Sequence, residues 1–258
     1  NQSTDPIIIS SQLAQMLKLS NELYNLSAGA FDPTVKPLID LWGFNNKNAY
    51  FIIPSEINTI KASEFVGMDK LLIEDLTLTK VDPRIILDLS SIAKGHAVDK
   101  LSEKLTKLGI KEFMVEVGGE VLVAMPESKK KSFWKLGIVT PDYNYSQQEL
   151  FLKLHLQNHA LATSGDYRNY FVKNDSVYSH IFDPRVGSPI SNNVASVSVI
   201  ASTCAFADGL ATSIMVLGKD RGMALVEALD DVEAMIIQRQ ANNKLVSYYS
   251  SNFKQFLR

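Results

Sequence analysis

The sequence has a single cysteine among its 258 residues, Cys204, which excludes a disulfide framework within the chain. It also lacks any stretch that approaches the roughly 18 consecutive apolar residues of a membrane-spanning helix. Basic residues are not in excess, because 26 lysines and arginines face 28 aspartates and glutamates, for a formal net charge of −2. Proteins that bind nucleic acid normally show a basic excess, so the charge balance argues against that class.

Several familiar catalytic signatures are missing as well. The sequence contains no Gly-x-Gly-x-x-Gly, His-Glu-x-x-His, Gly-x-Ser-x-Gly, Cys-x-x-Cys or Walker A pattern. Their absence argues against a Rossmann dehydrogenase, a zinc protease, a lipase-type hydrolase, a thiol redox protein and a P-loop NTPase. The one tight basic run, Lys129–Lys131, is interpreted as a solvated hairpin loop rather than a binding patch.

The spacing of apolar residues predicts a mixture of helices and many short strands. Apolar residues at helical spacing predict a helix over 11–26, with Ser10 or Ser11 as the N-cap. They also predict a second helix, over 97–108, which ends at Gly109. A short helix is expected to follow the turn at 31–34 and to end at Leu41. Further helices are expected at about 56–65, 204–217 and 220–229, with a short one at the C-terminus. Strands are expected at 71–73, 77–81, 85–87, 112–117, 120–125, 134–139, 149–156, 159–163, 168–172, 177–182, 194–200, 233–238 and 244–248. This order indicates an α+β fold with a largely antiparallel sheet core, in a single domain over residues 1–258.

One short sequence occurs in two related copies. Residues 31–35, Phe-Asp-Pro-Thr-Val, are echoed by residues 182–186, Phe-Asp-Pro-Arg-Val. The echo has two explanations, pseudo-symmetric halves or the coincidence of a common Asp-Pro turn. We favour the second, because Asp-Pro turns are frequent.

Asp208 and Thr212 form the first candidate for chemistry. On a helix, residues four apart face the same way. A carboxylate and a hydroxyl are hard oxygen ligands that suit Mg²⁺, which commonly completes its coordination with waters and substrate phosphates. The structural alternative is an aspartate that complements the helix dipole and a threonine that packs in the core.

Residues 88–96, Asp-Leu-Ser-Ser-Ile-Ala-Lys-Gly-His, form the second candidate. They join an apolar segment to the helix that ends at Gly109. Free backbone N–H groups at a helix start, small residues and a lysine favour a phosphate-binding cradle. A strand, a turn and a serine-capped helix would give the same pattern without a ligand.

Three further segments combine polar groups with turn residues. In residues 116–120, paired glycines indicate either close approach to a ligand or a two-residue hairpin turn. In residues 179–187, His180 could act as a general base or bind a ligand, although a lone histidine at a strand end is commonly structural. Residues 162–170 supply hydroxyls and two tyrosines, which on one strand would point to opposite faces.

Taken together and in order, these motifs resemble the FAD:protein FMN transferase family, also called ApbE. The resemblance runs over essentially the whole chain. It is carried by SAGAFDPTVKPLIDLWGF at 27–44, LDLSSIAKGH at 87–96, VEVGGEV at 115–121, ATSGDYRNY at 162–170, SHIFDPRVGSP at 179–189 and ADGLATSIMVLG at 207–218. The resemblance implies an α+β fold that binds FAD and Mg²⁺. It also implies transfer of FMN, through its phosphate, to a threonine of an acceptor such as a subunit of sodium-translocating NADH:quinone oxidoreductase.

The resemblance also implies roles for individual residues. Metal ligation is expected from Asp208 and Thr212 with help from the backbone of Ser91 and Ala93, although some relatives have a further aspartate where this chain has Ala211. Contacts with FAD, or a place in the lining of its pocket, are expected from Ala30, Phe31, Asp32, Asp88, Lys94, Glu116, Gly118, Gly119, His180 and Ile181. His180 or Asp208 is expected to accept the proton of the attacking hydroxyl; the sequence does not choose between them.

One departure from the family concerns the N-terminus. The family usually has an N-terminal portion with a Met-Gly-Thr motif and a Ser-Thr-Tyr stretch, and this chain begins after the place where both should lie. Family members are often exported, many as lipoproteins. The resemblance therefore implies a location on the periplasmic side of the bacterial inner membrane, with a lipid anchor outside this chain.

Three other functions remain open from the sequence. A Mg²⁺-dependent FAD diphosphatase would use a nearly identical site and release FMN and AMP. A non-catalytic FAD-binding protein would keep FAD intact. A structural α+β domain, in which the glycine and Asp-Pro motifs are only turns, would bind no flavin.

Overall fold

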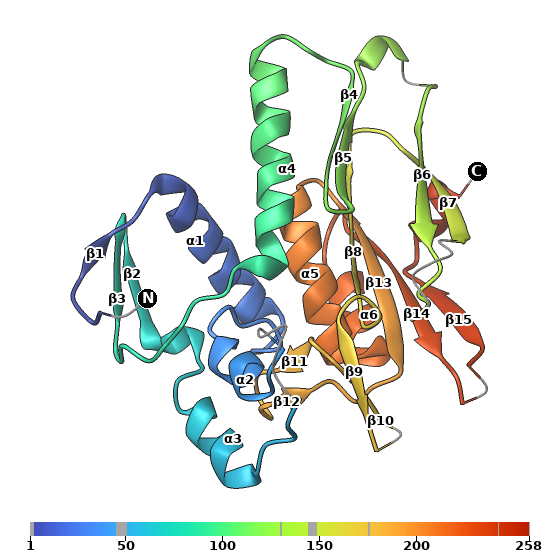
Figure 1. Ribbon diagram of the computed structural model, residues 1–258. Coiled ribbons are helices and arrows are strands. Elements are labelled where there is room, and N and C mark those ends of the chain that lie inside the picture. The colour runs from blue at the N-terminus through green and yellow to red at the C-terminus, as the bar shows by residue number, and fades with distance from the viewer. Residues whose placement is uncertain are drawn as a thin grey trace. The chain divides into compact units, whose positions relative to one another are not determined.

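The computed structural model describes residues 3–44, 51–129, 131–143, 149–174, 176–241 and 243–257. The chain divides into two compact units, the first formed by 1–91 and 169–191 and the second by 92–168 and 192–258. Figure 1 gives the order of helices and strands along the chain. Among the described residues, no helix is both long enough and apolar enough to cross a membrane. The mixed α and β composition confirms the predicted fold class.

Three α-helices of the first unit follow the predicted local signals. They are α1 (Ser11–Leu26), α2 (Lys36–Leu41) and α3 (Glu56–Ser63). The Ser10 hydroxyl accepts the Leu13 N–H at 3.2 Å, and the Ser55 hydroxyl accepts the Asn58 N–H at 3.4 Å. Both serines satisfy backbone N–H groups that a helix start leaves unpaired, which explains why these two helices begin where they do.

The strands of the first unit are short and antiparallel. One sheet has the order β1-β3-β2, from β1 (Ile7–Ile8), β2 (Leu71–Glu74) and β3 (Thr77–Lys80), after the 3₁₀ helix η1 (Met68–Lys70). Two hairpins follow, one from β9 (Tyr170–Lys173) and β10 (Ser176–Ser179), the other from β11 (Phe182–Asp183) and β12 (Ser188–Pro189). One core cluster joins Leu38, Trp42, Phe171 and Phe182. Sequence reasoning missed β1 and β12, which are only two residues long.

The strand predicted at 85–87 is wrong. These residues have no strand partner, because their polar backbone groups are satisfied by side chains and turns instead. The ammonium of Lys80 donates to the Ile85 carbonyl at 2.7 Å, and the Asp88 N–H donates to the Pro33 carbonyl at 2.7 Å. An apolar run of this kind therefore folds as an extended connection.

The Asp-Pro echo reflects shared turn chemistry. In both copies an Asp Oδ1 accepts the backbone N–H two residues on, at 2.8 Å from Thr34 and 3.0 Å from Arg185. A third turn, Asp82-Pro83-Arg84, makes the same bond at 2.8 Å and has no part in the echo. Since the bond also occurs at an Asp-Pro turn outside the echo, it gives no sign of internal symmetry.

The second unit is built on a six-stranded antiparallel sheet with the order β15-β14-β13-β8-β5-β4 (Figure 1). Its strands are β4 (Phe113–Val117), β5 (Glu120–Ala124), β8 (Ala160–Gly165), β13 (Val194–Ala201), β14 (Glu233–Arg239) and β15 (Leu245–Tyr249). A separate hairpin pairs β6 (Trp134–Val139) with β7 (Leu150–Leu156). Every residue of β13 is buried, as expected for a strand covered on both faces.

Different elements cover the two faces of this sheet. On one face, α4 (Ser90–Lys107) and α5 (Cys204–Leu217) pack through Val98 and Cys204 on Phe113, Val115 and other strand residues. On the other face, β6, β7 and the 3₁₀ helix η3 (Phe253–Phe256) pack on Val121, Leu161 and Ile237. The helix α6 (Lys219–Glu227) follows α5 directly. The two faces therefore present their side chains to different surroundings.

The loop predicted around the basic run is partly described. The 3₁₀ helix η2 (Glu127–Lys129) ends at its first lysine, and Lys129 forms an ion pair with Glu112. Lys130 lies outside the described residues.

Candidate active site

Three charged side chains of the second unit meet where α4, α5 and the start of β5 come together. The ammonium of Lys94 lies 3.2 Å from Glu120 Oε1 and 3.6 Å from Asp208 Oδ1. The side chains of Glu120 and Asp208 are only 1% and 3% exposed, whereas that of Lys94 is 38% exposed. The cluster thus buries two carboxylates and leaves their shared cation at the surface.

A glycine allows the two helices to meet closely at this point. A Cβ atom on Gly95 would lie 2.4 Å from the Cys204 carbonyl oxygen, closer than side chains approach backbone. The Gly95 N–H donates to Asp208 Oδ2 at 3.0 Å. Gly95 therefore serves both the packing of α4 on α5 and the orientation of the Asp208 carboxylate.

The cluster contains two carboxylates but only one ammonium. Burial raises the pKa of Asp208 to about 7, Lys94 acts to lower it, and the neighbouring Glu120 adds to the rise. Burial likewise raises the pKa of Glu120, and Glu120 Oε2 is buried without a hydrogen-bond partner. Two carboxylates share one ammonium, so an additional cation would offset the cost of burying them.

Two hydroxyls extend this set of oxygen atoms. Thr212 lies one turn after Asp208 on α5, and its Oγ1 is 3.0 Å from Ser164 Oγ and 3.4 Å from the Asp208 carbonyl. No group of three or more His, Cys, Asp or Glu side chains within the described ranges is arranged to hold a metal. A cation at Asp208 would therefore depend on hydroxyl, carbonyl, water and substrate oxygens, which is how Mg²⁺ is usually bound. The donor set fits Mg²⁺ in this respect, and buried Ala211 adds no ligand.

Asp99 fixes the start of α5, a role that sequence reasoning missed. Its two carboxylate oxygens accept the N–H groups of Cys204 at 2.7 Å and Ala205 at 2.9 Å. Thr203, the residue at the N-cap position of α5, makes no side-chain capping bond. Burial raises the pKa of Asp99, and these two N–H bonds act to lower it. A side chain of α4 therefore caps the helix that carries Asp208 and Thr212.

The paired glycines form a two-residue hairpin turn between β4 and β5. Val117 pairs with Glu120, and Gly118 and Gly119 have φ of +63° and +100°, which glycine adopts at no steric cost. A Cβ on Gly118 would lie 3.0 Å from Lys94 Cδ, and one on Gly119 would lie 3.0 Å from an Arg168 guanidinium nitrogen. The sequence left open a hairpin turn or a close approach to a ligand. The structure shows the turn, and the close approach to a ligand stays a prediction.

A cavity of about 490 Å³ lies on the face of the sheet opposite α4 and α5. Glu116, Gly118, Gly119, Thr163 and Arg168 are among its lining residues. Glu116 pairs with Val121, whose side chain packs in the core on that face, whereas Glu120 points to the helices. The predicted contact residue Glu116 and the missed residue Glu120 are thus four positions apart and face opposite sides.

The remaining predicted residues lie in the first unit, apart from Ala93, which is exposed on α4 of the second. Ala30 and Phe31 are each 2% exposed and belong to the core. Asp32 Oδ1 accepts the Thr34 N–H at 2.8 Å and the Thr34 hydroxyl at 2.6 Å. Asp88 Oδ1 accepts the Ser90 N–H at 2.9 Å at the start of α4, where Ser91 is half-buried. Asp32 and Asp88 thus each stabilise a local turn by accepting the N–H two residues on.

The predicted base His180 follows β10 in the first unit. The imidazole is half-buried, and its Nδ1 lies 3.0 Å from the Asn169 carbonyl oxygen. The neighbouring Ile181 is buried and its N–H lies 3.4 Å from the Ser179 hydroxyl. The structure thus brings Lys94, Gly95, Asp208 and Thr212 together in the second unit, and places Ala30, Phe31, Asp32, Asp88, Ser91, His180 and Ile181 in the first.

Comparisons with known proteins are consistent with one another. Residues 1–236 match the model of the ApbE family. An FAD:protein FMN transferase of Vibrio cholerae is 40% identical over 256 residues, which cover 99% of this chain and 75% of the relative. The corresponding enzyme of Haemophilus influenzae is 36% identical over 262 residues, again 99% and 75% of the two chains.

Solved structures show the same fold. The flavin transferase ApbE from Vibrio cholerae superimposes with a TM-score of 0.85 at 37% identity, covering 100% of this chain and 80% of the other. The apo form of a flavinyl transferase ApbE from Pseudomonas stutzeri gives a TM-score of 0.86 at 31% identity, with 100% and 78% covered.

Proposed function

Since the chain belongs to the ApbE family and is an FAD:protein FMN transferase, we propose that it uses Mg²⁺ and joins FMN to a threonine of its acceptor protein. The observation that carries this proposal is the buried cluster of Lys94, Glu120 and Asp208, with its surplus of carboxylate. A structural role alone would not require two nearly inaccessible carboxylates that share one half-exposed ammonium.

Asp208 and Thr212 are the proposed side-chain ligands of Mg²⁺, with backbone oxygens from Ser91–Ala93 as the resemblance implies. The pKa of Asp208 is raised because the effect of burial outweighs that of the neighbouring Lys94, and a bound cation would act in the same direction as Lys94. When bound, the metal would supply neutralisation of negative charge on the FAD diphosphate. Lys94 would add to that neutralisation, because its side chain is 38% exposed at the edge of the cluster.

In the proposed step the acceptor hydroxyl oxygen forms a bond to the FMN-side phosphorus of FAD. The bond between that phosphorus and the bridging oxygen breaks, and AMP leaves with the bridging oxygen. The hydroxyl proton passes to a base of the enzyme. Transfers of this type depend mainly on positioning and on stabilisation of charge.

Two side chains are candidates for that base. The carboxylate of Asp208 already faces Lys94 and accepts the Gly95 N–H. His180 Nδ1 lies beside the Asn169 carbonyl, and when Nδ1 donates there, Nε2 is the basic nitrogen. We therefore assign the proton to His180 and ligation to Asp208. His180→Gln should lower the rate of FMN transfer while leaving Mg²⁺ affinity unchanged; an unaltered rate would exclude His180 as the base.

The acceptor and the location follow from the family resemblance. We propose an acceptor of the sodium-translocating NADH:quinone oxidoreductase type, on the periplasmic side of the inner membrane, with a lipid anchor outside this chain. Fractionation of cells that produce the full-length protein would test the location. Recovery in the cytoplasmic fraction would exclude it.

The central experiment mixes the protein with FAD, Mg²⁺ and a purified acceptor domain that carries the target threonine. Mass spectrometry of the acceptor should show the addition of FMN, with AMP in the solution, and EDTA should abolish both. Asp208→Ala should behave like EDTA, and Asp40→Ala, at an exposed aspartate of α2, is the matched control. Free FMN and AMP with an unmodified acceptor would identify a diphosphatase instead.

A further inference from the structure

The hydroxyl of Thr212 on α5 meets the hydroxyl of Ser164 on β8. The two oxygens lie 3.0 Å apart, so one of them donates a hydrogen bond to the other. Side chains of a strand alternate between the two faces of its sheet, and Ala160 of β8 packs with Cys204 of α5. Ala160, Ala162 and Ser164 therefore face the helices, and Ser164 is the polar one of these three.

The Thr212 hydroxyl differs from other hydroxyls within the helices of this protein. A serine or threonine in a helix commonly donates to the carbonyl four residues back. Bonds of this kind, 2.8–3.2 Å long, are made by Ser20, Thr59, Thr106 and Ser213. The corresponding distance from Thr212 Oγ1 to the Asp208 carbonyl oxygen is 3.4 Å. The contact with Ser164 is therefore the shorter of the two that the Thr212 hydroxyl makes.

The direction of the Thr212 hydroxyl hydrogen decides whether its oxygen can bind a cation. A hydroxyl has one hydrogen and two lone pairs, so the oxygen can coordinate a cation only when the hydrogen points elsewhere. The Asp208 carbonyl is a poor place for it, because that carbonyl is also the helical acceptor of the Thr212 N–H. Ser164 Oγ is closer, and a hydrogen donated to it leaves the lone pairs of Thr212 available.

We propose that Ser164 is a positioning residue of the proposed Mg²⁺ site, which accepts the hydrogen of the Thr212 hydroxyl and so keeps the lone pairs of that oxygen available to the ion. The proposal rests on the proposed function, because it takes Thr212 as a ligand. Ser164 itself acts only through Thr212. Outer partners of this kind fix the orientation of a ligand, and their loss typically lowers metal affinity by about tenfold to a hundredfold.

Displacement of bound Mn²⁺ by Mg²⁺, followed by electron paramagnetic resonance, measures the site without any transfer of FMN. With FAD present and no acceptor protein, Ser164→Ala should raise the Kd for Mg²⁺ about tenfold. The Kd for Ca²⁺ should rise less, because Ca²⁺ tolerates irregular coordination and Mg²⁺ requires a near-ideal octahedron. In EDTA the melting temperature should stay within about 3 °C of the wild type. A lower melting temperature with unchanged Kd values would overturn the proposal, because Ser164 would then be structural only.

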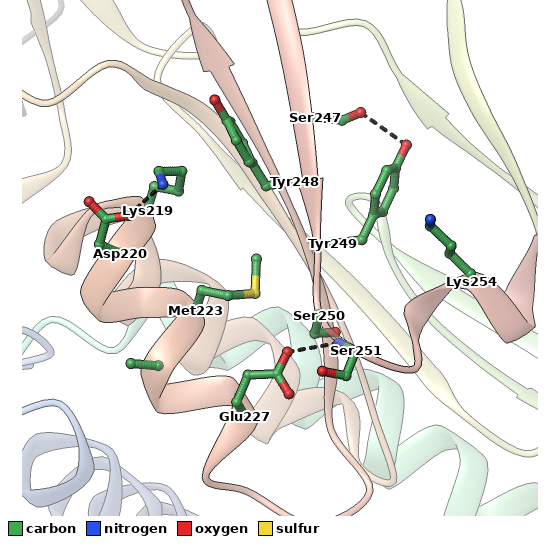
Figure 2. A pocket seen from close by; sticks show the side chains of 11 residues that line it. Lys219, Asp220, Met223, Glu227, Ser247, Tyr248, Tyr249, Ser250, Ser251 and Lys254 are labelled. Atoms are coloured by element: carbon green, nitrogen blue, oxygen red, sulfur yellow. Dashed lines mark hydrogen bonds and ion pairs between the residues drawn. The ribbon is translucent and has the colours of Figure 1, made fainter.

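Ser247→Ala is the matched control, since it also removes a serine from a pair of hydroxyls. The Ser247 hydroxyl donates to the Tyr249 hydroxyl at 3.0 Å, the same distance as between Ser164 and Thr212. Figure 2 shows this pair in a groove of about 680 Å³ whose described lining includes neither Asp208 nor Thr212. The control should bind Mg²⁺ like the wild type. A tenfold loss of affinity here as well would refute a specific role of Ser164.

A double-mutant cycle tests whether Ser164 acts through Thr212. Thr212→Val keeps the shape of the side chain and removes its hydroxyl, so it should itself raise the Kd for Mg²⁺. In that background Ser164→Ala should cause no further rise, because the hydrogen that Ser164 accepts is already gone. Additive effects of the two substitutions would contradict the proposal.

The two proposals fail in different ways. If the wild type binds no Mn²⁺ that Mg²⁺ displaces, or if Thr212→Val binds Mg²⁺ as tightly as the wild type, the proposed metal site fails and the role of Ser164 fails with it. If Thr212→Val weakens Mg²⁺ binding and Ser164→Ala does not, only the role of Ser164 fails.

Discussion

Asp32 and Asp208 are both buried aspartates, 7% and 2% exposed, and burial raises the pKa of each. Asp32 is satisfied locally, because Thr34, two residues on, donates both its N–H and its hydroxyl to the same oxygen. Asp208 depends on Gly95 and Lys94, more than a hundred residues away, and shares the lysine with Glu120. A carboxylate that its own turn satisfies holds the chain in place, whereas one left short of positive charge can bind a cation.

The largest effect is expected from Asp208→Ala. Loss of the proposed ligand should lower the rate of FMN transfer by at least about a hundredfold, which exceeds the usual effect of losing an outer partner of a metal site. Mg²⁺ should also no longer raise the melting temperature in the presence of FAD. Quantitative mass spectrometry of the acceptor and a thermal scan measure these effects. Full activity in this variant would remove the distinction between the two aspartates.

The pH dependence of stability should separate the two carboxylates in the metal-free protein. The folded pKa of Asp208 is about 7, well above that of an aspartate in an unfolded chain, so the folded state binds more protons between these values. This group therefore favours folding at low pH, and that contribution falls as pH rises from about 4 to 7, by up to about 1.4 kcal/mol per pH unit.

Denaturant unfolding of the wild type and of Asp208→Asn would measure this contribution. The difference between the two should change steeply between pH 5 and pH 7 and level off above. A difference that is independent of pH would mean that Asp208 ionises normally. The same comparison with Asp32→Asn should show a smaller change, because hydrogen bonds from Thr34 act against the effect of burial there.

Asp32→Ala should act mainly on stability. It leaves the Thr34 N–H and hydroxyl without their acceptor, and that hydroxyl also accepts the Gly67 N–H at 2.7 Å. The free energy of unfolding should fall by about 1–3 kcal/mol. If Asp32→Asn restores stability and retains FAD affinity, the turn accounts for this residue. Loss of FAD binding in a stable Asp32→Asn variant would support the contact with FAD that the family resemblance implies.

The smallest expected change comes from Asp99→Ala, which removes the cap of α5 without touching the cluster. The free energy of unfolding should fall by about 1–2 kcal/mol, because two N–H groups lose their acceptor. If the cap positions Asp208, Mg²⁺-dependent affinity for FAD should fall about tenfold as well. Asp99→Asn keeps an acceptor and should recover part of both losses. A loss of stability with unchanged affinity would limit Asp99 to a structural role.

Local signals were predictable from the sequence, and long-range partners were not. The helix α1 follows from apolar spacing and the Ser10 cap, which are contained within the segment itself. The strand expected at 85–87 was wrong: the Ile85 carbonyl accepts a hydrogen bond from the Lys80 ammonium, and the next residue after the segment, Asp88, donates its N–H to Pro33. Each correct element could be read from neighbouring residues, while this error depended on partners brought together only by folding.

The candidate site was predictable to the same extent. The helical spacing of Asp208 and Thr212 was predictable, and their role as metal ligands stays a prediction. Glu120 could not be found, because its direction depends on a hairpin turn that places it on the helical face, opposite to Glu116. One available signal was missed for Asp99. It lies four residues after Gly95 on the same face of α4, which is the face that packs on α5.

The close packing of α4 on α5 has a consequence for Cys204, the only thiol in the chain. Its Sγ is buried 3.6 Å from the Val121 carbonyl, and burial raises the pKa of the thiol. A thiol reagent can therefore react only when α5 moves away from the sheet. The rate at which a thiol reagent labels Cys204 would therefore measure how often α5, the helix that bears Asp208, moves away from the sheet.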